Sequence, residues 1–266
     1  MITGYAHYHN GKLYYEADGV GEPLLLIHGI DSDIRLWDDQ YKELSKHFRV
    51  IRFDLRGFGN SPFPEGECNN NDDILLILQT LGIENEKVNL VGYSFGGTIA
   101  VNFALEYPDH VNSIILVSPG LIGYAWSEES IQYHRNFHQA MQDRDFERMF
   151  DLLYWKSVYG QYRTEEEIDL DTICQKLRLM FEHALTIPRE GKLTPIGNQI
   201  ERLHEIASPT LVVTGKLNFD DYKDVAQIYT SKIPNAKMVL MEGVSHLVNM
   251  EQPETFNNLV RDFLAC

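Results

Sequence analysis

Short apolar segments alternate with longer amphipathic ones through the first 117 residues. The apolar segments span four or five residues, as is typical of strands buried on both faces of a parallel sheet. They lie at residues 24–27, 50–54, 88–91 and 114–117. Between these segments, at 34–47, 72–81 and 94–106, apolar residues recur at the spacing of a helix. Because strands that alternate with helices are joined by right-handed crossovers, this half of the chain predicts an α/β fold with a mostly parallel central sheet flanked by helices.

The same alternation returns near the end of the chain, with strands at 211–214 and 238–241 and helices at 221–232 and 254–264. At the other end, segments 5–9 and 12–17 flank Asn10-Gly11, which is the strongest short-range signal for a β-hairpin. The sheet is therefore expected to carry an antiparallel hairpin at its start.

The middle of the chain has a different pattern. Residues 121–206 read as helical, rich in aromatic and charged side chains, with no convincing strand. The simplest organisation is a core domain formed by 1–120 and 207–266, interrupted by a helical cap at 121–206. Tyr124 and Trp126 leave the core nearest the predicted site, so they are the first candidates for contact with a substrate.

The composition is that of an acidic globular protein. Lys and Arg number 23 against 39 Asp and Glu, which gives a formal net charge of −16. A surface of this sign repels phosphate backbones and anionic lipids, so we expect no nucleic-acid partner and no membrane partner. No run of about 18 apolar residues is present, so we expect no membrane-spanning helix.

Cysteine, histidine and the first residues of the chain indicate a cytoplasmic protein without a metal site. Cys68, Cys174 and Cys266 are odd in number, widely spaced and outside any CxxC pair, which predicts reduced thiols. The first 19 residues have neither the basic nor the apolar segment of a secretory signal. None of the ten histidines falls in an HExxH or comparable metal-binding spacing.

The strongest chemical signal is the sequence GYSFGG at residues 92–97, between a predicted strand and a predicted helix. A serine presented on a sharp strand-to-helix turn needs small neighbours, and the flanking glycines remove the Cβ atoms that would clash. Ser94 is therefore the candidate nucleophile. The backbone amide of Phe95, at the N-terminus of the following helix, is a candidate donor to an oxyanion.

Two earlier strand ends are expected to border this serine. The dipeptide His-Gly at 28–29 ends one strand, and the backbone amide of Ile30 is the candidate second oxyanion donor. The sequence DLRGFGNS at 54–61 ends the next strand. Its glycines suit a tight loop, and Asp54 with Arg56 is expected to form a structural ion pair. We interpret this loop as scaffold beside the site.

His246 is the candidate general base. It ends the sequence GVSH at 243–246, just after the last predicted strand, and open α/β sheets place their sites at the carboxyl ends of strands. A lone histidine is more often structural, but this one follows the nucleophile in the expected order. Pro253 suits the first turn of the closing helix.

These motifs, in this order and on these elements, resemble those of the α/β-hydrolase fold family. The resemblance covers nearly the whole chain and is greatest to small esterases, lactonases and carbon–carbon-bond hydrolases with a helical cap. It implies a triad of nucleophile, histidine and acid, with a small, partly apolar substrate enclosed beneath the cap. Ser94 disfavours the haloalkane dehalogenase branch, which needs a carboxylate nucleophile. Whether the chain forms a homo-oligomer is left open.

The acid position departs from the family pattern. The family commonly places its acid three residues after a glycine that ends the strand before the last crossover; here Asn218 stands there, after Gly215. An amide can hydrogen-bond a histidine, but it supplies no charge and can select the wrong tautomer. Asp220 or Asp221 on the same loop is the alternative acid, although acidic residues are also common in the first turn of a helix. Segment 118–121, after an earlier strand, offers no acid.

The expected function is that of a serine hydrolase that cleaves an ester, lactone or thioester by forming an acyl-enzyme, without a cofactor. Two other functions remain open. A carbon–carbon-bond hydrolase acting on a diketone would use the same groups. A ligand-binding protein with little turnover would explain the neutral residue Asn218.

Overall fold

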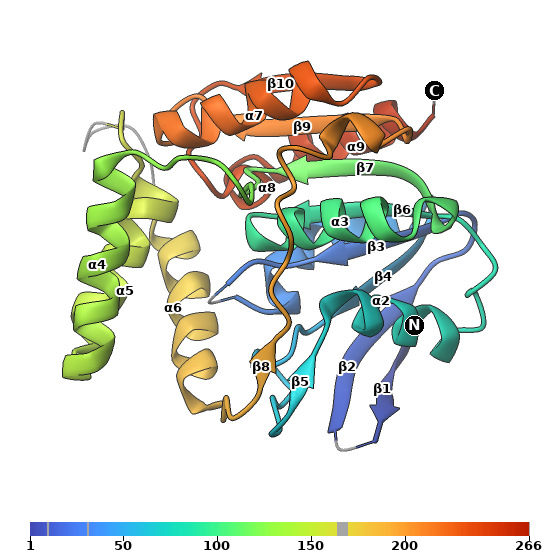
Figure 1. Ribbon diagram of the computed structural model, residues 1–266, viewed down its shortest axis with the longest axis horizontal. Coiled ribbons are helices and arrows are strands. Elements are labelled where there is room, and N and C mark those ends of the chain that lie inside the picture. Colours follow the sequence, from blue (N-terminus) through green and yellow to red (C-terminus); the bar gives the residue numbers. More distant parts are fainter. Residues whose placement is uncertain (10, 31, 164–169, 266) are drawn as a thin grey trace.

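The computed structural model describes residues 1–9, 11–30, 32–163 and 170–265. Over these residues the chain forms an eight-stranded sheet in the order β1-β2-β4-β3-β6-β7-β9-β10 (Figure 1). The pairs β1–β2 and β2–β4 are antiparallel, and every pair from β4 to β10 is parallel. The strands of this sheet are β1 (Ile2–Tyr8), β2 (Gly11–Asp18), β3 (Pro23–Ile27), β4 (Arg49–Phe53), β6 (Val88–Tyr93), β7 (Val111–Val117), β9 (Thr210–Gly215) and β10 (Ala236–Met241).

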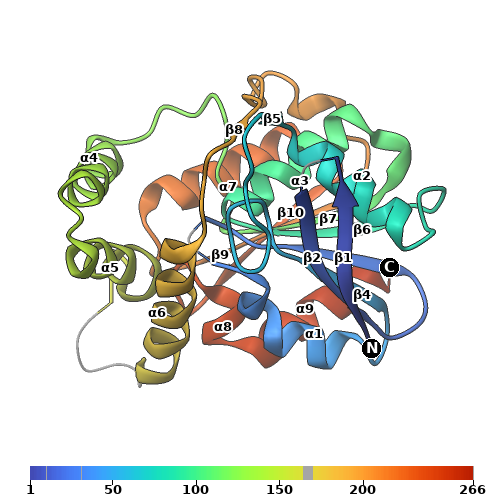
Figure 2. The same ribbon diagram turned by 90° about the horizontal axis from the view of Figure 1, so that it is seen from below.

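Helices cover both faces of this sheet, and a separate group stands beyond one of its ends (Figures 1 and 2). The α-helices are α1 (Asp38–Leu44), α2 (Asn70–Thr80), α3 (Phe95–Glu106), α4 (Glu128–Asp143), α5 (Phe146–Tyr154), α6 (Asp171–Thr186), α7 (Asp220–Lys232), α8 (Val248–Glu251) and α9 (Pro253–Leu264). Single turns of 3₁₀ or π helix are η1 (Ile34–Trp37), η2 (Pro108–His110), η3 (Trp155–Tyr159) and η4 (Leu203–Glu205). Within the described ranges, no helix has the length and apolarity to cross a membrane.

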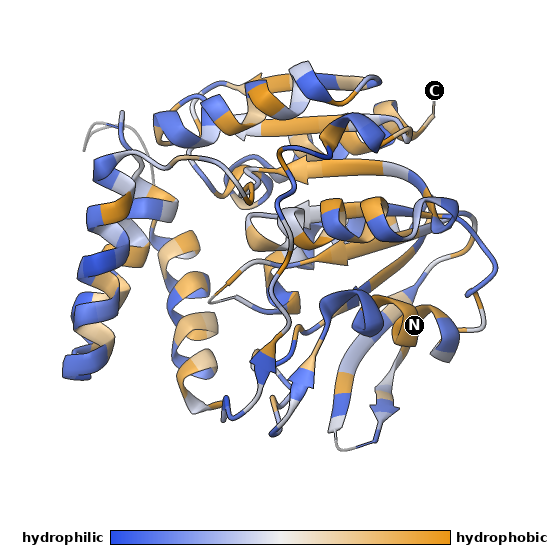
Figure 3. Cartoon of the chain, viewed as in Figure 1, coloured by the Kyte–Doolittle hydropathy of each residue, from blue (hydrophilic) through white to orange (hydrophobic). Residues whose placement is uncertain are grey.

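The mostly parallel sheet predicted from the sequence is confirmed, and its central strands are buried on both faces. All five residues of β3 are buried. Leu25 and Ile27 belong to a core shared with α2, α3 and α7, whereas Leu24 and Leu26 belong to a core shared with α1 and α9. The apolar colouring of the central strands in Figure 3 follows from this double burial. Burial of each such leucine contributes about 1.5–3 kcal/mol.

The two elements predicted before residue 50 outside the sheet core, a β-hairpin and a helix, are confirmed in part. β1 and β2 pair in the register Tyr8↔Gly11, although Asn10 of the expected Asn-Gly turn lies outside the described residues. The single helix expected over 34–47 is instead a 3₁₀ turn followed by α1, which ends at Leu44. The side chain of Asp33 caps the 3₁₀ turn by accepting the backbone N–H of Arg35 at 3.0 Å.

The prediction that the cap contains no strand is wrong. β8 (Lys192–Leu193) pairs in parallel with β5 (Glu67–Cys68), and the two form a small separate sheet. Each strand has two residues, which is too short to produce a period-2 pattern in the sequence.

The expected ion pair between Asp54 and Arg56 is also wrong. The Nε atom of Arg56 donates to Asp73 of α2 at 2.7 Å. Asp54 is fully buried and accepts the backbone N–H groups of Ile34 (2.9 Å) and Asn60 (2.8 Å). The two side chains therefore leave the strand end in different directions, one stabilising the loop and the other reaching a helix.

Helices α4, α5 and α6 stand at the end of the sheet toward which the arrow of β7 points (Figure 1). Their buried side chains, among them Met149, Phe150 and Phe181, join the core shared with α1 and α9. The chain leaves the sheet after β7 and returns to it at β9. The helical segment therefore lies over the carboxyl ends of the parallel strands, where the sequence places its candidate catalytic residues.

The close packing of α3 on β6 predicts the effect of a single methyl group. A Cβ atom at Gly92 would lie 2.4 Å from the carbonyl oxygen of Gly96, so Gly92→Ala should lower the free energy of unfolding by about 1–3 kcal/mol. Gly197→Ala is the matched control, because its Cβ would meet no atom within 4 Å. Urea denaturation of both variants measures the difference, and equal stabilities would contradict this account of the packing.

Candidate active site

Ser94 occupies a strained turn between β6 and α3. Its φ of 51° and ψ of −113° are rare for a residue with a side chain and cost on the order of 1–3 kcal/mol. The turn is held by its own backbone: the N–H of Ser94 donates to Val117 at 2.9 Å, and its carbonyl accepts from Gly97 (3.0 Å) and Gly120 (3.2 Å). Hydrogen bonds to β7 on one side and to α3 on the other therefore hold Ser94 in this strained conformation.

Two glycines bring further backbone close to this turn. A Cβ atom at Gly96 would lie 2.2 Å from the carbonyl oxygen of Ile27, and one at Gly29 would lie 3.2 Å from the Cβ of Ser94. The residue after Gly29 is Ile30, so its loop runs beside the serine. Phe95 begins α3, and an amide in the first turn of a helix has no acceptor within that helix. This arrangement suits two amides that converge on an oxyanion.

His246 is buried, with 2% of its surface exposed, on the loop that follows β10. Its ring contacts that of Tyr93, the residue before Ser94, with 5.2 Å between centroids, and that of Tyr222 at 4.3 Å. Burial holds the pKa of His246 well below its ordinary value, because a buried imidazolium loses its hydration, and the positive charge of Lys156 acts in the same direction. The imidazole is therefore neutral at neutral pH.

Asn218 lies behind this imidazole on the loop that follows β9. Its Nδ2 atom is 3.1 Å from Nδ1 of His246, and its Oδ1 atom accepts the backbone N–H of Phe219 at 2.9 Å. That second bond fixes which end of the amide faces the histidine. Because Nδ2 can only donate, Nδ1 of His246 is the acceptor and the ring proton sits on Nε2. A base for Ser94 needs the opposite tautomer.

The two alternative acids are engaged elsewhere. Asp221 accepts from the hydroxyl of Tyr124 (3.0 Å) and from the backbone and hydroxyl of Ser127 (3.0 and 2.6 Å). Asp220 accepts from Tyr162 at 2.6 Å. In the part of the chain that the structure describes, neither carboxylate hydrogen-bonds His246, which leaves Asn218 as its neighbour.

Tyr124 and Trp126 lie on the α7 side of the cap. Their rings meet edge to face at 5.1 Å, and Trp126 contacts Tyr222 at 5.4 Å. Tyr222 in turn contacts His246, so the candidate substrate-binding pair approaches the histidine through a third ring. A role in substrate binding for these two residues stays a prediction.

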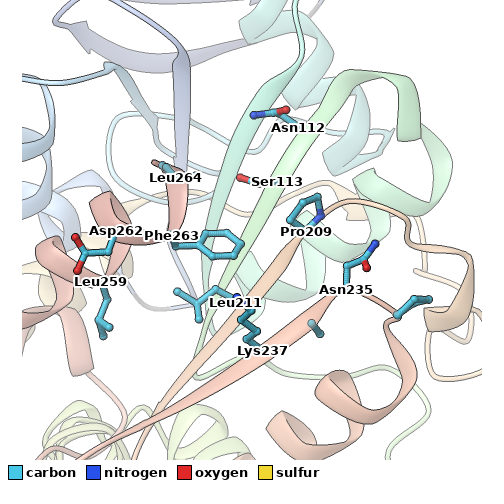
Figure 4. A pocket seen from close by; sticks show the side chains of 12 residues that line it. Asn112, Ser113, Pro209, Leu211, Asn235, Lys237, Leu259, Asp262, Phe263 and Leu264 are labelled. Carbon is cyan, nitrogen blue, oxygen red and sulfur yellow. The ribbon is translucent and has the colours of Figure 1, made fainter. Parts of the chain in front are cut away.

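A cavity of about 540 Å³ opens between the cap helices and Ile30. Its walls are mainly apolar, which suits a small, partly apolar ligand. The lining side chains include Ile30, Phe137, Met141, Phe146, Met149, Leu185 and Ile187. A larger cavity, of about 780 Å³, lies elsewhere: it is formed at the amino ends of β7, β9 and β10, at the opposite end of the sheet from Ser94 (Figure 4).

Several buried groups at the site have no clear signal in the sequence. His28 accepts the backbone N–H of Leu55 on Nε2 at 2.9 Å, which ties two strand ends together, and burial lowers its pKa to about 4. Ser118, with φ of 44°, donates to the carbonyl of His246 at 2.9 Å. Both directly follow buried strands, and that position is the one signal that points to them. Among the described residues, no group of three His, Cys, Asp or Glu side chains could hold a metal ion.

The comparison with known proteins agrees with this fold. A family model described as the alpha/beta hydrolase fold matches residues 22–253. The chain therefore belongs to the α/β-hydrolase fold family. By its family it is a hydrolase.

Relatives within this family carry several activities. The chain is 25% identical over 276 residues to the 2-hydroxy-6-oxononadienedioate/2-hydroxy-6-oxononatrienedioate hydrolase of Comamonas testosteroni, which covers 96% of this chain and 92% of that protein. It is 26% identical to the pimeloyl-[acyl-carrier protein] methyl ester esterase of Nitrosospira multiformis, covering 94% and 97%. Among solved structures, a thermophilic esterase from Thermogutta terrifontis has a TM-score of 0.78 at 25% identity, covering 100% and 98%. The enol-lactonase of Burkholderia xenovorans LB400 shares the fold with a TM-score of 0.77 at 24% identity, covering 99% and 100%.

The contact between Asn218 and His246 gives a direct spectroscopic prediction. In Asn218→Asp the carboxylate should accept a proton from Nδ1 and stabilise the imidazolium, so the pKa of His246 should rise. Nitrogen chemical shifts of the imidazole, followed through a pH titration, measure both the tautomer and the pKa. Asp220→Asn should leave both unchanged. An Nδ1 atom that stays unprotonated in Asn218→Asp would show that the two side chains do not interact in this way.

Proposed function

We propose that this chain is a serine hydrolase that cleaves a small, partly apolar ester or lactone through an acyl-enzyme, with slow turnover. The observation that supports this most is the position of His246 between two loops: Asn218 lies 3.1 Å from it, and the ring of Tyr93, the residue before Ser94, contacts its ring. Ser94, His246 and Asn218 follow β6, β10 and β9 at one edge of the sheet. The strained backbone at Ser94 supports a functional role for that residue, because such strain clusters at active sites.

The proposed reaction has two steps. The Oγ atom of Ser94 attacks the carbonyl carbon while its proton passes to Nε2 of His246, and the negative oxygen is stabilised by the amides of Ile30 and Phe95. Each amide contributes about 3 kcal/mol. His246 then returns the proton to the departing alcohol. In the second step a water molecule gives a proton to His246 and attacks the acyl carbon. His246 then returns that proton to Oγ of Ser94 as the bond to the acyl group breaks, which releases the acid and restores the free serine and the neutral imidazole.

Asn218 makes the first step slow. Before Nε2 can accept a proton, the imidazole must move its own proton to Nδ1, where it meets an N–H of the amide instead of an acceptor. The amide also supplies no negative charge to balance the imidazolium that forms. In a serine protease, the same exchange of a carboxylate for an amide lowers kcat by about 10⁴. Activity above the uncatalysed rate then depends on the oxyanion amides and on substrate positioning.

The cavity beside Ile30 indicates the kind of substrate. Its volume of about 540 Å³ is within the range of small-molecule sites. Its lining is mainly apolar, with His134, His138 and Arg189 as the polar side chains, and it favours a partly apolar acyl or alcohol group. An ester carbonyl held at the amide of Ile30 would direct that group into the cavity. The esterase and lactonase names among the similar proteins are consistent with such a substrate.

Cleavage of a carbon–carbon bond in a diketone is the second candidate function. Two relatives are named as hydrolases of 2-hydroxy-6-oxo dienedioates, at 25% and 28% identity. Such a reaction would use the same serine, histidine and amides. Parallel assays with an ester and with a 2-hydroxy-6-oxo dienoate, each under single-turnover conditions, distinguish the two by which substrate is consumed faster.

Acylation of the serine tests the proposal directly. Incubation with p-nitrophenyl acetate should release p-nitrophenol and leave an acetyl group on Ser94. Because p-nitrophenolate is a good leaving group, acylation by this ester depends less on His246 than deacylation does, and the acyl-enzyme should accumulate. Mass spectrometry of the intact protein and of its peptides locates the group. Ser94→Ala should show neither the adduct nor the release. A wild-type protein without an adduct under any condition would favour a ligand-binding function instead.

Replacement of the amide should increase the rate. Asn218→Asp should raise kcat at least tenfold, since the carboxylate selects the productive tautomer and balances the imidazolium. The sign of the pH dependence follows: with the pKa of His246 raised, activity should fall as the pH drops through that pKa, whereas the corresponding loss in the wild-type protein lies at lower pH. Steady-state kinetics from pH 5 to 9 measure both effects. Asn218→Ala, which supplies no charge, should give no increase; equal rates for both variants would remove Asn218 from the triad position.

A further inference from the structure

One segment of the cap contacts the two loops that carry candidate catalytic residues, which are the loop after β9 with Asn218 and the loop after β10 with His246. Residues 159–163, which we call the docking segment, begin at Tyr159, the last residue of η3. The N–H of Gln161 donates to the carbonyl of Leu217 at 3.1 Å, and its side-chain Oε1 accepts the N–H of Asp220 at 3.0 Å. These bonds bracket Asn218 on both sides. The docking segment therefore fixes the loop that carries Asn218.

Gly160 lets the docking segment reach the second loop as well. Its φ of 78° favours glycine, and a Cβ atom there would lie 2.2 Å from Oγ of Ser245 and 2.5 Å from the carbonyl of Leu217. Ser245 immediately precedes His246. The backbone of the cap thus packs against the residue beside the candidate base, with no side chain between them.

A buried ion pair completes this contact. Arg163 pairs with Glu251 of α8, and their side chains are 1% and 3% exposed. The Nε atom of Arg163 donates to the carbonyl of Tyr159 at 3.1 Å, so the guanidinium is also held by its own segment. The second carboxylate oxygen of Glu251 accepts the backbone N–H of Ser245 at 2.9 Å. A continuous chain of charge-assisted bonds therefore runs from the cap to the residue next to His246.

We propose that Arg163 and Glu251 are positioning residues that couple the seating of the cap to the placement of His246. This inference rests on the proposed function, in which His246 is the base for Ser94. Glu251 holds the amide of Ser245 only where its other oxygen is matched by Arg163, and Arg163 reaches it only when the docking segment lies on the loops.

The size of the effect follows from the geometry. Loss of Arg163 leaves a carboxylate buried without a partner, which either moves toward water or takes up a proton. Either change alters the bond to the N–H of Ser245 and shifts the neighbouring imidazole. A misplacement of about 1 Å at a reacting group can lower a rate by about 10²-fold. The exposed pair of Arg178 and Glu147, also on the cap, has no such connection to a catalytic loop within the described part of the chain.

The test uses a reaction that needs His246 but no knowledge of the substrate. Ser94 is labelled with a fluorophosphonate, which forms an O–P bond and loses fluoride while the serine proton passes to the histidine. Arg163→Met should slow labelling at least tenfold, and Arg178→Met should leave it unchanged. Hydrogen exchange at the amide of Ser245 should accelerate in Arg163→Met alone. A purely structural role would lower the melting temperature without changing the labelling rate measured far below it.

A double variant keeps the test decisive if the single variant fails to fold. Arg163→Met with Glu251→Leu removes both charges, so that no charge is left buried without a partner, and it also removes the acceptor of the Ser245 N–H. Slow labelling in the folded double variant supports the proposal, whereas labelling at the wild-type rate overturns it. If the wild-type protein itself is not labelled, the proposed function fails, and the exchange rate at Ser245 still decides whether Arg163 holds this loop.

Discussion

The close contact between helix α3 and the strands beneath it is the constraint on which the site depends. Glycines at 92 and 96 let the backbone of the helix approach β6 and β3 so closely that a single Cβ atom would meet a carbonyl oxygen. This packing leaves Ser94 in a left-handed conformation that costs energy, and the hydrogen bonds to Val117 and Gly120 offset it. The two candidate oxyanion amides come from the same contact, since both flank the point where α3 meets β3.

Charge is arranged differently around the histidine than in a triad with a carboxylate. Asn218 and His246 are both buried, and the pair is neutral because burial depresses the pKa of the imidazole. An ionised acid in this place would bring a desolvation cost that only a charged partner repays. The neutral amide avoids that cost and hydrogen-bonds Phe219, but it holds the imidazole in a tautomer unsuited to accept a proton. The contact that stabilises the resting site therefore disfavours the tautomer of His246 that proton transfer from Ser94 would need.

The cap is fixed to the core at two buried carboxylates. Asp221, at the start of α7, accepts three hydrogen bonds from Tyr124 and Ser127, where the cap begins. Glu251 binds Arg163 in the middle of the cap. Each carboxylate lies within five residues of a candidate catalytic group, so the contacts that hold the cap are also contacts of the catalytic loops. The formal net charge of the chain is −16. These two buried carboxylates each have their own hydrogen-bond or ion-pair partners, whereas most of the other acidic residues in the described ranges are not buried.

The sheet and the order of the motifs can be predicted from local patterns along the chain, because buried parallel strands are short apolar runs and each motif directly follows one of them. Strand ends also single out Ser94 and His246 as candidate site residues, and the resemblance to the family adds Asn218, with Asp220 and Asp221 left open. The sequence could not predict β5 and β8, which are too short to show a period, or the partner of Arg56, which depends on where α2 packs. Which end of Asn218 faces His246, and which cap residues reach Ser245, become evident only once the chain is folded. The orientation of Asn218 depends on the backbone N–H of Phe219 and on His246, 28 positions further along the chain. The contact of the cap with the loop of Ser245 depends on the pair of Arg163 and Glu251, 88 positions apart. No local pattern in the sequence encodes either contact.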